Sequence, residues 1–359
     1  MSDTEQYRYA IIGTGRERGT EGATGFGMAN AHWPAFKETG RVTLVAIADV
    51  DEGNARHFLT THEQPNTQVF TDYHRMLADV KPEIVSICTW PHLHAEMVVA
   101  ACEAGVRAIH CEKPMATHWG DAKRMKAAAD ASGTILTHNH QRRFLEPFQV
   151  VRGLLREGAI GKLERIEATC GDLFDWGTHW IDMFFFFNEE GEAEWVLGQI
   201  DSREEKRIFG AYAEEQGLCY FKFKNGVRAT LLTGFEANIG AAIRLSGSTG
   251  MIEIGWDSAV RIRAAGDCEW RKIETTESIH GDIAIPRAAA DLIRALDDPA
   301  HKPLLTVDNA LRATEVILST FESSRRRGRV DLPLDRDDSA LLDMLEKGEI
   351  GPNKITSLG

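Results

Sequence analysis

The stretch Ala108–Pro114 reads Ala-Ile-His-Cys-Glu-Lys-Pro, and it indicates how the N-terminal half of the chain folds. Its first four residues form a short, mostly apolar run typical of a buried strand, and similar runs occupy Ile84–Cys88 and Thr134–Thr137. Helix-like segments separate these runs, which is the alternation of a parallel sheet covered by helices. We therefore expect an α/β fold in which Ala108–Cys111 is one of several neighbouring parallel strands.

Two charged residues, Glu112 and Lys113, follow this strand directly. In open parallel sheets, ligands bind beyond the carboxyl ends of the strands. Pro114 disfavours helical backbone at Lys113, so an extended segment or a turn presents the lysine side chain. From there it can donate to a substrate oxygen or transfer a proton. A solvated Glu-Lys pair on a loop is the alternative interpretation.

The N-terminus contains a strand at Arg8–Ile12, the turn Gly13-Thr14-Gly15, and a second strand at Thr43–Ala48 that ends on Asp49. This order is typical of a dinucleotide-binding unit, in which glycines admit a pyrophosphate and the acidic residue accepts bonds from ribose hydroxyls. A glycine-rich insertion, Arg16–Gly27, replaces the usual third glycine, and we expect the helix to begin near Met28. A simple strand-to-helix turn would explain the same glycines.

The composition excludes several classes of protein. The chain has 359 residues and a formal charge of −13, which argues against nucleic acid as a partner. Six scattered cysteines without a C-x-x-C pair are typical of reduced thiols in a cytoplasmic protein. We find no apolar run long enough for a membrane span and no signal segment. Five histidines could suggest a metal site: His92, His94, His110, His138 and His140. Their spacing is not that of metal ligands, so we predict no metal site.

The sequence becomes rich in strand-like segments beyond about residue 145, where we place a domain boundary. We expect a dinucleotide-binding domain at 1–145, a mostly antiparallel α+β domain at 146–335, and a polar tail at 336–359. The turn Lys224-Asn225-Gly226 lies between two alternating segments and predicts a β-hairpin. Amphipathic helices are expected at Pro286–Leu296 and Val307–Ser324.

A second cluster of polar residues lies in this domain, between Asp172 and Asp182. Asp175, His179 and Asp182 are spaced i, i+4 and i+7, so on a helix they would share one face. A carboxylate beside an imidazole suits general acid/base chemistry. A helix cap formed by Asp172 or Asp175, with a histidine on the polar face, is the alternative interpretation.

These motifs together resemble the Gfo/Idh/MocA oxidoreductases, from about Arg8 to Pro333. The resemblance rests on the Gly13 and Gly15 turn, Thr89 with His94, Glu112-Lys113-Pro114, Arg143-Phe144 with Pro147, and Asp175–Asp182. It implies a Rossmann domain followed by a mostly antiparallel open-sheet domain, and a homodimer or homotetramer. Trp90, where the family commonly has proline, and the Arg16–Gly27 insertion depart from the family pattern.

The resemblance also implies roles for individual residues. Catalysis would use Lys113 on the substrate hydroxyl, His179 as proton acceptor and Asp175 as its partner. The cofactor would contact Gly13, Thr14, Gly15, Asp49, Thr89, Pro91, His94, Glu112 and Lys113. The substrate would contact Lys113, Arg143, Asp175, Trp176 and His179.

Three functions are consistent with this pattern. The first is NAD-dependent oxidation of a ring hydroxyl in a sugar, sugar derivative or cyclitol. The second is glycoside cleavage by transient oxidation and elimination with bound NAD. The third is a non-catalytic regulator that binds a sugar or nucleotide. Asp49 and Asp51 would repel a 2′-phosphate, so we expect NAD rather than NADP.

Overall fold

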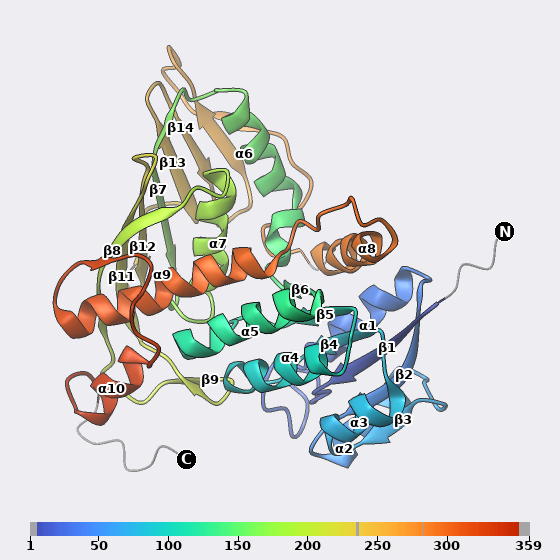
Figure 1. The fold of residues 1–359 in the computed structure, drawn as a ribbon. Coiled ribbons are helices and arrows are strands. Elements are labelled where there is room, and N and C mark those ends of the chain that lie inside the picture. Colours follow the sequence, from blue (N-terminus) through green and yellow to red (C-terminus); the bar gives the residue numbers. More distant parts are fainter. Residues whose placement is uncertain (1–5, 235–236, 282, 352–359) are drawn as a thin grey trace. The chain divides into compact units, whose positions relative to one another are not determined.

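The chain divides into two compact units, and the computed structural model describes residues 6–234, 237–281 and 283–351 (Figure 1). The first unit comprises Met1–Thr117, Asp121–Gln141 and Asp282–Leu311, and the remainder forms the second. After the short exchange at His118–Gly120, the chain passes from the first unit to the second between Gln141 and Arg142. Residues 283–311 differ from the prediction, because they pack with the first unit and not with the second.

A six-stranded parallel sheet forms the centre of the first unit, in the order β3-β2-β1-β4-β5-β6. Its strands are β1 (Tyr7–Ile12), β2 (Val42–Ala48), β3 (Gln68–Phe70), β4 (Ile84–Ile87), β5 (Ala108–Cys111) and β6 (Ile135–His138). The prediction of a parallel sheet is confirmed, and the five predicted strands agree with the structure to within one residue at each end. The short edge strand β3 was not predicted.

Helices cover both faces of this sheet. They are α1 (Ala29–Glu38), α2 (Glu52–Thr61), α3 (Tyr73–Val80), η1 (Pro91–Leu93), α4 (His94–Glu103), α5 (Trp119–Ser132) and α8 (Ala284–Asp297). One buried cluster joins apolar side chains of β1, such as Tyr9 and Ile11, to Phe36 of α1, Phe58 of α2 and Leu292 of α8. These three helices therefore share one face. Helices α3 and α4 contact each other and, with α5, lie along the other face (Figure 1).

The second unit is built on a nine-stranded sheet in the order β16-β15-β14-β13-β7-β12-β11-β8-β17. Its strands are β7 (Leu163–Cys170), β8 (Ala193–Asp201), β11 (Gln216–Phe223), β12 (Arg228–Thr233), β13 (Ile243–Gly247), β14 (Met251–Ile254), β15 (Val260–Arg263), β16 (Arg271–Ile273) and β17 (Val330–Asp331). Only β7 and β12 pair in parallel, so the predicted mostly antiparallel sheet is confirmed. Strands β9 (Arg207–Ile208) and β10 (Ala211–Tyr212) form a separate small ribbon.

The predicted hairpin joins β11 to β12, with Lys222 opposite Arg228. Gly226 has φ of 95°, a backbone conformation that glycine adopts without steric cost. Helices α6 (Glu146–Arg156), α7 (Gly177–Phe187), α9 (Val307–Arg326) and α10 (Ala340–Glu346) complete the unit, η2 (Gln141–Phe144) precedes α6, and α9 begins in the first unit. Helix α9 crosses β8 closely: Ser323 Oγ accepts from Gly198 N at 2.8 Å, and a Cβ at Gly198 would lie 2.5 Å from Thr320.

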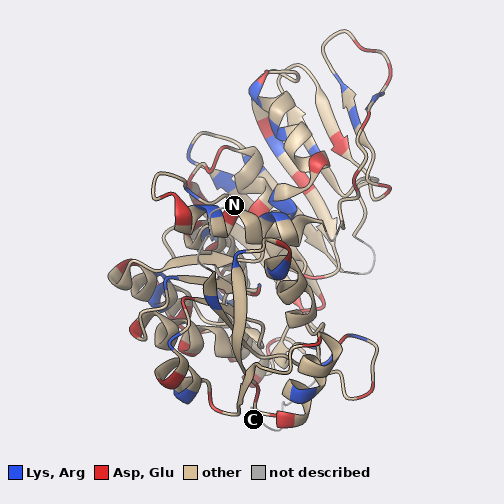
Figure 2. Cartoon of the chain, turned by 90° about the vertical axis from the view of Figure 1, so that its right-hand side faces the viewer, with Lys and Arg blue, Asp and Glu red and all other residues tan. Residues whose placement is uncertain are grey.

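The C-terminal segment packs against the second unit, which differs from the predicted polar tail. Ala340, Leu341, Met344 and Leu345 of α10 are buried, and Arg325 of α9 pairs with Asp338 at 2.6 Å and with Asp343 at 3.2 Å. The predicted tail beyond residue 351 lies outside the described residues. Acidic and basic residues are interspersed across both units (Figure 2). No helix within the described ranges is long and apolar enough to cross a membrane.

Candidate active site

A cavity of about 350 Å³ lies at the carboxyl ends of β1, β2 and β4 in the first unit. Four predicted cofactor residues line it, namely Gly13, Gly15, Asp49 and Thr89. Asp51, which was expected beside Asp49 near the ribose, also lines it. Further lining residues were not predicted from the sequence: Ile12, Thr24, Ala48, Val50, Asn54, Thr71, Tyr73, Cys88, Trp90, Leu93 and Met97. The position agrees with the rule that ligands bind where the strand order reverses in an open parallel sheet.

The glycine turn leaves room for a ligand at the cavity wall. Gly13 has φ of 84°, and a Cβ there would lie 2.6 Å from Cγ2 of Thr89. Gly15 has φ of 55°, and a Cβ there would meet only Gly27, at 3.8 Å. Both glycines therefore line the cavity with backbone that carries no side chain, as a dinucleotide pyrophosphate site requires, and these residues fit NAD.

Asp49 binds the same turn. Its Oδ2 accepts hydrogen bonds from Thr14 N at 2.8 Å, Thr14 Oγ1 at 2.8 Å and Gly15 N at 2.9 Å, and its Oδ1 accepts from Asp51 N. The side chain holds the loop in place as well as lining the cavity. Thr14 itself is buried and does not line the cavity.

The insertion Arg16–Gly27 folds back on itself between the turn and α1. Gly27 packs so tightly on the backbone of Arg16 that a Cβ would lie 2.3 Å from the Arg16 carbonyl oxygen. Arg16 Nε donates to Asn54 Oδ1 at 2.9 Å, and Thr24 lines the cavity. The insertion thus supplies part of the cavity wall, and helix α1 begins at Ala29, as predicted to within one residue.

His94 joins the segments that follow β4 and β5. Its Nε2 lies 3.1 Å from the Thr89 carbonyl oxygen, and its Nδ1 lies 3.0 Å from that of Pro114. The ring is fully buried, and burial lowers its pKa. His94 and Pro91 do not line the cavity, so the structure gives His94 a positioning role next to the cis Lys113–Pro114 peptide.

Glu112 belongs to a buried polar network that was not predicted. Its Oε1 lies 2.8 Å from His32 Nε2 and accepts from Asn139 Nδ2 at 2.7 Å. His32 Nδ1 lies 3.1 Å from Ser86 Oγ, which accepts from Tyr9 at 2.6 Å. Burial alone would raise the pKa of Glu112, but the hydrogen bond and charge of His32 oppose this, and the pKa falls to about 2. An ionised carboxylate therefore precedes Lys113, whose backbone N–H donates to Glu112 Oε2 at 3.2 Å.

The second unit carries the other predicted catalytic residues. Helix α7 begins at Gly177, so Asp175 precedes it, and the prediction that Asp175, His179 and Asp182 share a helical face is wrong for Asp175. Asp172 Oδ1 accepts from Asp175 N at 2.6 Å and Trp176 N at 3.0 Å, which fixes the chain entering the helix. His179 lies in the first turn of α7 and is 5% exposed.

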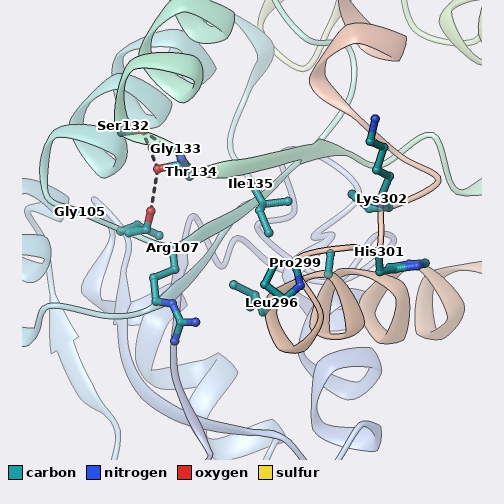
Figure 3. Close-up of a pocket in the computed structure, with 13 residues that line it drawn as sticks. Gly105, Arg107, Ser132, Gly133, Thr134, Ile135, Leu296, Pro299, His301 and Lys302 are labelled. Atoms are coloured by element: carbon teal, nitrogen blue, oxygen red, sulfur yellow. Dashed lines mark hydrogen bonds between the residues drawn. The ribbon is translucent and has the colours of Figure 1, made fainter.

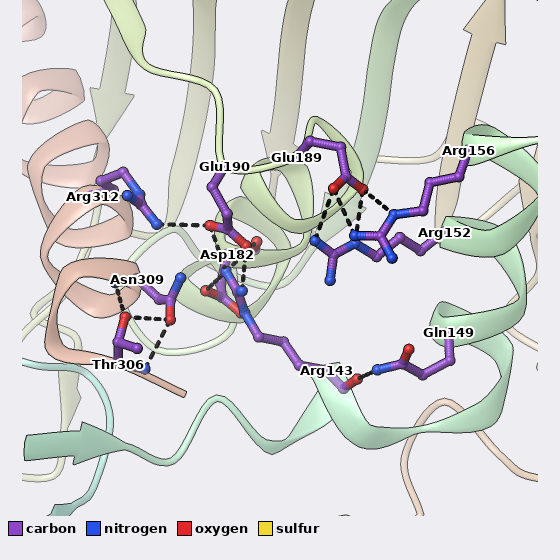
Figure 4. Close-up of polar contacts among 10 residues, drawn as sticks. All are labelled: Arg143, Gln149, Arg152, Arg156, Asp182, Glu189, Glu190, Thr306, Asn309 and Arg312. Atoms are coloured by element: carbon purple, nitrogen blue, oxygen red, sulfur yellow. Dashed lines mark hydrogen bonds and ion pairs between the residues drawn. The ribbon is translucent and has the colours of Figure 1, made fainter. Parts of the chain in front are cut away.

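Arg143 differs from its predicted role as a substrate contact. Its side chain is 1% exposed, and Nε and Nη2 donate to the two carboxylate oxygens of Asp182, each at 2.8 Å (Figure 4). Nη1 donates to Glu190 at 2.5 Å, and Glu190 also pairs with Arg312 at 2.7 Å. Arg143 therefore forms a buried ion-pair cluster with Asp182, and we remove it from the proposed substrate contacts.

A second cavity, of about 490 Å³, lies at the opposite end of the strands of the first sheet (Figure 3). Val106 and Arg107, which precede β5, and Ile135, which begins β6, line it together with Leu296 and His301. It therefore opens at the amino ends of the strands, away from the glycine turn. Among the described residues, no group of three or more His, Cys, Asp or Glu side chains could hold a metal ion.

Comparisons with known proteins agree with this geometry. The model of an oxidoreductase family with an NAD-binding Rossmann fold, GFO_IDH_MocA, matches residues 7–140, and that of the GFO/IDH/MocA C-terminal domain matches residues 170–253. A myo-inositol 2-dehydrogenase of Thermotoga maritima is 25% identical over 263 residues, which is 68% of this chain and 74% of that protein.

Two further relatives extend the comparison. A 2,7-anhydro-N-acetylneuraminate hydratase of Mediterraneibacter gnavus is 30% identical over 155 residues, covering 43% of this chain and 37% of that protein. A levoglucosan dehydrogenase structure with NADH and levoglucosan has a TM-score of 0.77 at 19% identity, covering 92% of this chain and all of that chain.

This chain belongs to the Gfo/Idh/MocA family of oxidoreductases. It is an NAD-binding oxidoreductase of a family that includes sugar and cyclitol dehydrogenases.

Proposed function

We propose that this enzyme oxidises a ring hydroxyl of a sugar, sugar derivative or cyclitol, with NAD as hydride acceptor. The observation that carries the proposal is the placement of Lys113 at the carboxyl end of β5, beside β4. The residues that follow β4, Cys88 and Thr89, line the cofactor cavity. When bound, NAD supplies the hydride chemistry, and the protein supplies position and proton transfer.

The proton needs its own path, because an alcohol loses O–H hydrogen as a proton while hydride leaves carbon. We propose that His179 accepts this proton, since an imidazole titrates near neutral pH. Lys113 would hold and polarise the hydroxyl oxygen, with the ionised Glu112 supporting its charge. Asp175 would act as the partner that orients His179.

A second function has a specific observation in its favour. The name of the hydratase relative describes a reaction without net oxidation. Glycoside cleavage by transient oxidation and elimination would use the same residues with NAD retained. The third function, a non-catalytic regulator, requires none of Lys113, Asp175 and His179, so their presence together argues against it.

One experiment separates the three functions. Sugars, cyclitols and glycosides are incubated with the enzyme and NAD or NADP, while absorbance of reduced nicotinamide and release of aglycone are both followed. A dehydrogenase produces NADH in proportion to the substrate consumed. A glycoside-cleaving enzyme releases aglycone without net NADH, and a regulator does neither. The Lys113→Ala variant is the matched negative control.

We also propose that the enzyme is a homodimer or homotetramer. Val196, Ile200, Cys219 and Phe221 are buried on one face of the second sheet. The alternating residues on the other face include Leu197 and Leu218, which are 45% and 41% exposed. Exposed apolar residues on a sheet face are typical of an interface between subunits. Light scattering on the native protein and on Leu197→Glu tests this, since the charge should dissociate the oligomer.

A further inference from the structure

Two adjacent arginines in η2 have different environments. The guanidinium of Arg143 is saturated by carboxylates, as described above. Arg142 is 8% exposed, and within the described residues its Nη1 has no hydrogen-bond partner. Its Nη2 lies 3.4 Å from Nδ1 of His280, and its Cζ lies 4.5 Å from the ring centre of Trp180.

A buried guanidinium with unused N–H groups is costly. Removing a charge from water without a hydrogen-bonding counter-ion carries a penalty of several kcal/mol, and stacking on a buried aromatic ring offsets about 2 kcal/mol of it. Burial lowers the pKa of Arg142 to about 10, with Cys170 and Asp175 acting in the opposite direction. The side chain is therefore still a cation at neutral pH, and its Nη1 is a buried donor without a hydrogen-bond partner among the described residues.

The two rings that contact this cation, Trp180 and His280, belong to a larger aromatic cluster in the second unit. The ring centre of Trp256 lies 5.8 Å from that of Trp176 and 6.1 Å from that of Trp180. Trp256 also stacks on His280, with ring centres 6.3 Å apart and an interplanar angle of 11°. The indole N–H of Trp180 donates to the Thr169 carbonyl oxygen at 2.9 Å, which fixes the ring under the guanidinium. Trp256 is 41% exposed, so the cluster reaches solvent.

We infer that Arg142 binds a carboxylate of the substrate, and that the substrate is therefore a sugar acid, such as a hexuronate. A carboxylate presents two oxygens that match the guanidinium fork, and its single charge balances one arginine. A phosphate dianion would bring a second negative charge close to Asp175. The rings of Trp176 and Trp256 supply apolar faces on which the C–H face of a sugar ring can pack.

This assignment rests on the proposed function, because it names the substrate class of the same enzyme. Arg142 differs from an arginine with a purely structural role in one respect. A structural arginine needs a protein partner for its in-plane N–H groups, and within the part of the chain that the structure describes those of Arg142 make only the long contact to His280. Arg143, one residue further, shows how this fold satisfies a buried arginine when stability is its role.

The test measures binding, so that it does not depend on turnover. The protein is saturated with NADH, and D-glucuronate, D-galacturonate and D-mannuronate are titrated by calorimetry against D-glucose, D-galactose and D-mannose. At least one hexuronate should bind about 10-fold or more tightly than its own aldose, the scale of a charged hydrogen bond. Arg142→Gln should abolish this preference, Arg142→Lys should keep part of it, and Arg156→Gln, an exposed arginine of α6, should keep all of it.

Three outcomes overturn the inference. They are equal binding of every hexuronate and its aldose, an unchanged preference in Arg142→Gln, and binding of acetate alone as tightly as the hexuronates. Thermal unfolding of both Arg142 variants shows whether they are folded, and the lysine variant carries the test if the glutamine variant is not. Hexuronate binding without NAD reduction by any sugar would refute the proposed dehydrogenase activity but would still support the carboxylate site.

Discussion

Replacing Arg143 by methionine should destabilise the protein and leave substrate recognition unchanged. The guanidinium and the Asp182 carboxylate are 1% and 0% exposed, and the substitution removes two hydrogen bonds of 2.8 Å from a carboxylate that stays buried. Removing one partner of a buried pair costs about 3–5 kcal/mol. Glu190 adds little, because it is 28% exposed and keeps its ion pair with Arg312.

Urea unfolding, followed by tryptophan fluorescence, measures this loss. Arg143→Met should lower the free energy of unfolding by about 3–5 kcal/mol, and the double change with Asp182→Leu should recover most of it, since no charge is left buried. Arg152→Met, which removes one of two arginines bound to the exposed Glu189, should cost about 1 kcal/mol or less. An unchanged unfolding midpoint together with a raised KM in Arg143→Met would show that Arg143 contacts the substrate and does not stabilise the fold.

Three other predictions concern the cofactor and the effect of pH. The wild-type enzyme should prefer NAD, and Asp49→Ala with Val50→Arg should erode the preference in steady-state kinetics; equal turnover with NADP in the wild type would contradict this. Deleting residues 18–25 should raise the Kd and the dissociation rate of NAD, measured by stopped-flow fluorescence. Unchanged values would show that this loop is exposed to solvent and does not hold the cofactor. Burial raises the pKa of Glu214 from 4.5 to about 8, so folding takes up a proton and stability falls as pH rises through this window. Glu214→Gln should flatten that fall in urea unfolding and be more stable than wild type above about pH 8; an unchanged pH slope would count against it.

Much of the first unit could be predicted because its signals are local. An apolar run that ends in Glu112-Lys113-Pro114, or in a glycine turn, specifies a strand and its carboxyl end without knowledge of distant contacts. The strands and the placement of Gly13, Gly15 and Asp49 on one cavity followed from such signals, whereas the placement of Thr89 there followed from the family resemblance. The return of α8 to the first unit did not, because its apolar face fits either unit by periodicity alone.

The predicted site was less accurate where neighbouring residues of one type divide their roles. Arg142 and Arg143 are indistinguishable in sequence, and only the carboxylates brought by α7 and the loop after it separate them. Asp175 has helical spacing from His179, but it lies in the loop before the helix. Its backbone N–H donates to the side chain of Asp172, and the helix begins two residues after Asp175. The network around Glu112 was missed because His32 is 80 residues away in sequence.

We propose that Lys113 and His179 act together on one substrate hydroxyl. With a substrate from the panel, steady-state rates across pH are compared for Lys113→Ala, His179→Ala and the double variant. We predict that each single change lowers turnover by about 10²-fold or more. The double variant should be little worse than the more severe single one, because the two groups work as a unit. The rate of His179→Ala should recover as pH rises, and wild-type turnover of His179→Ala at neutral pH would exclude His179 as the proton acceptor.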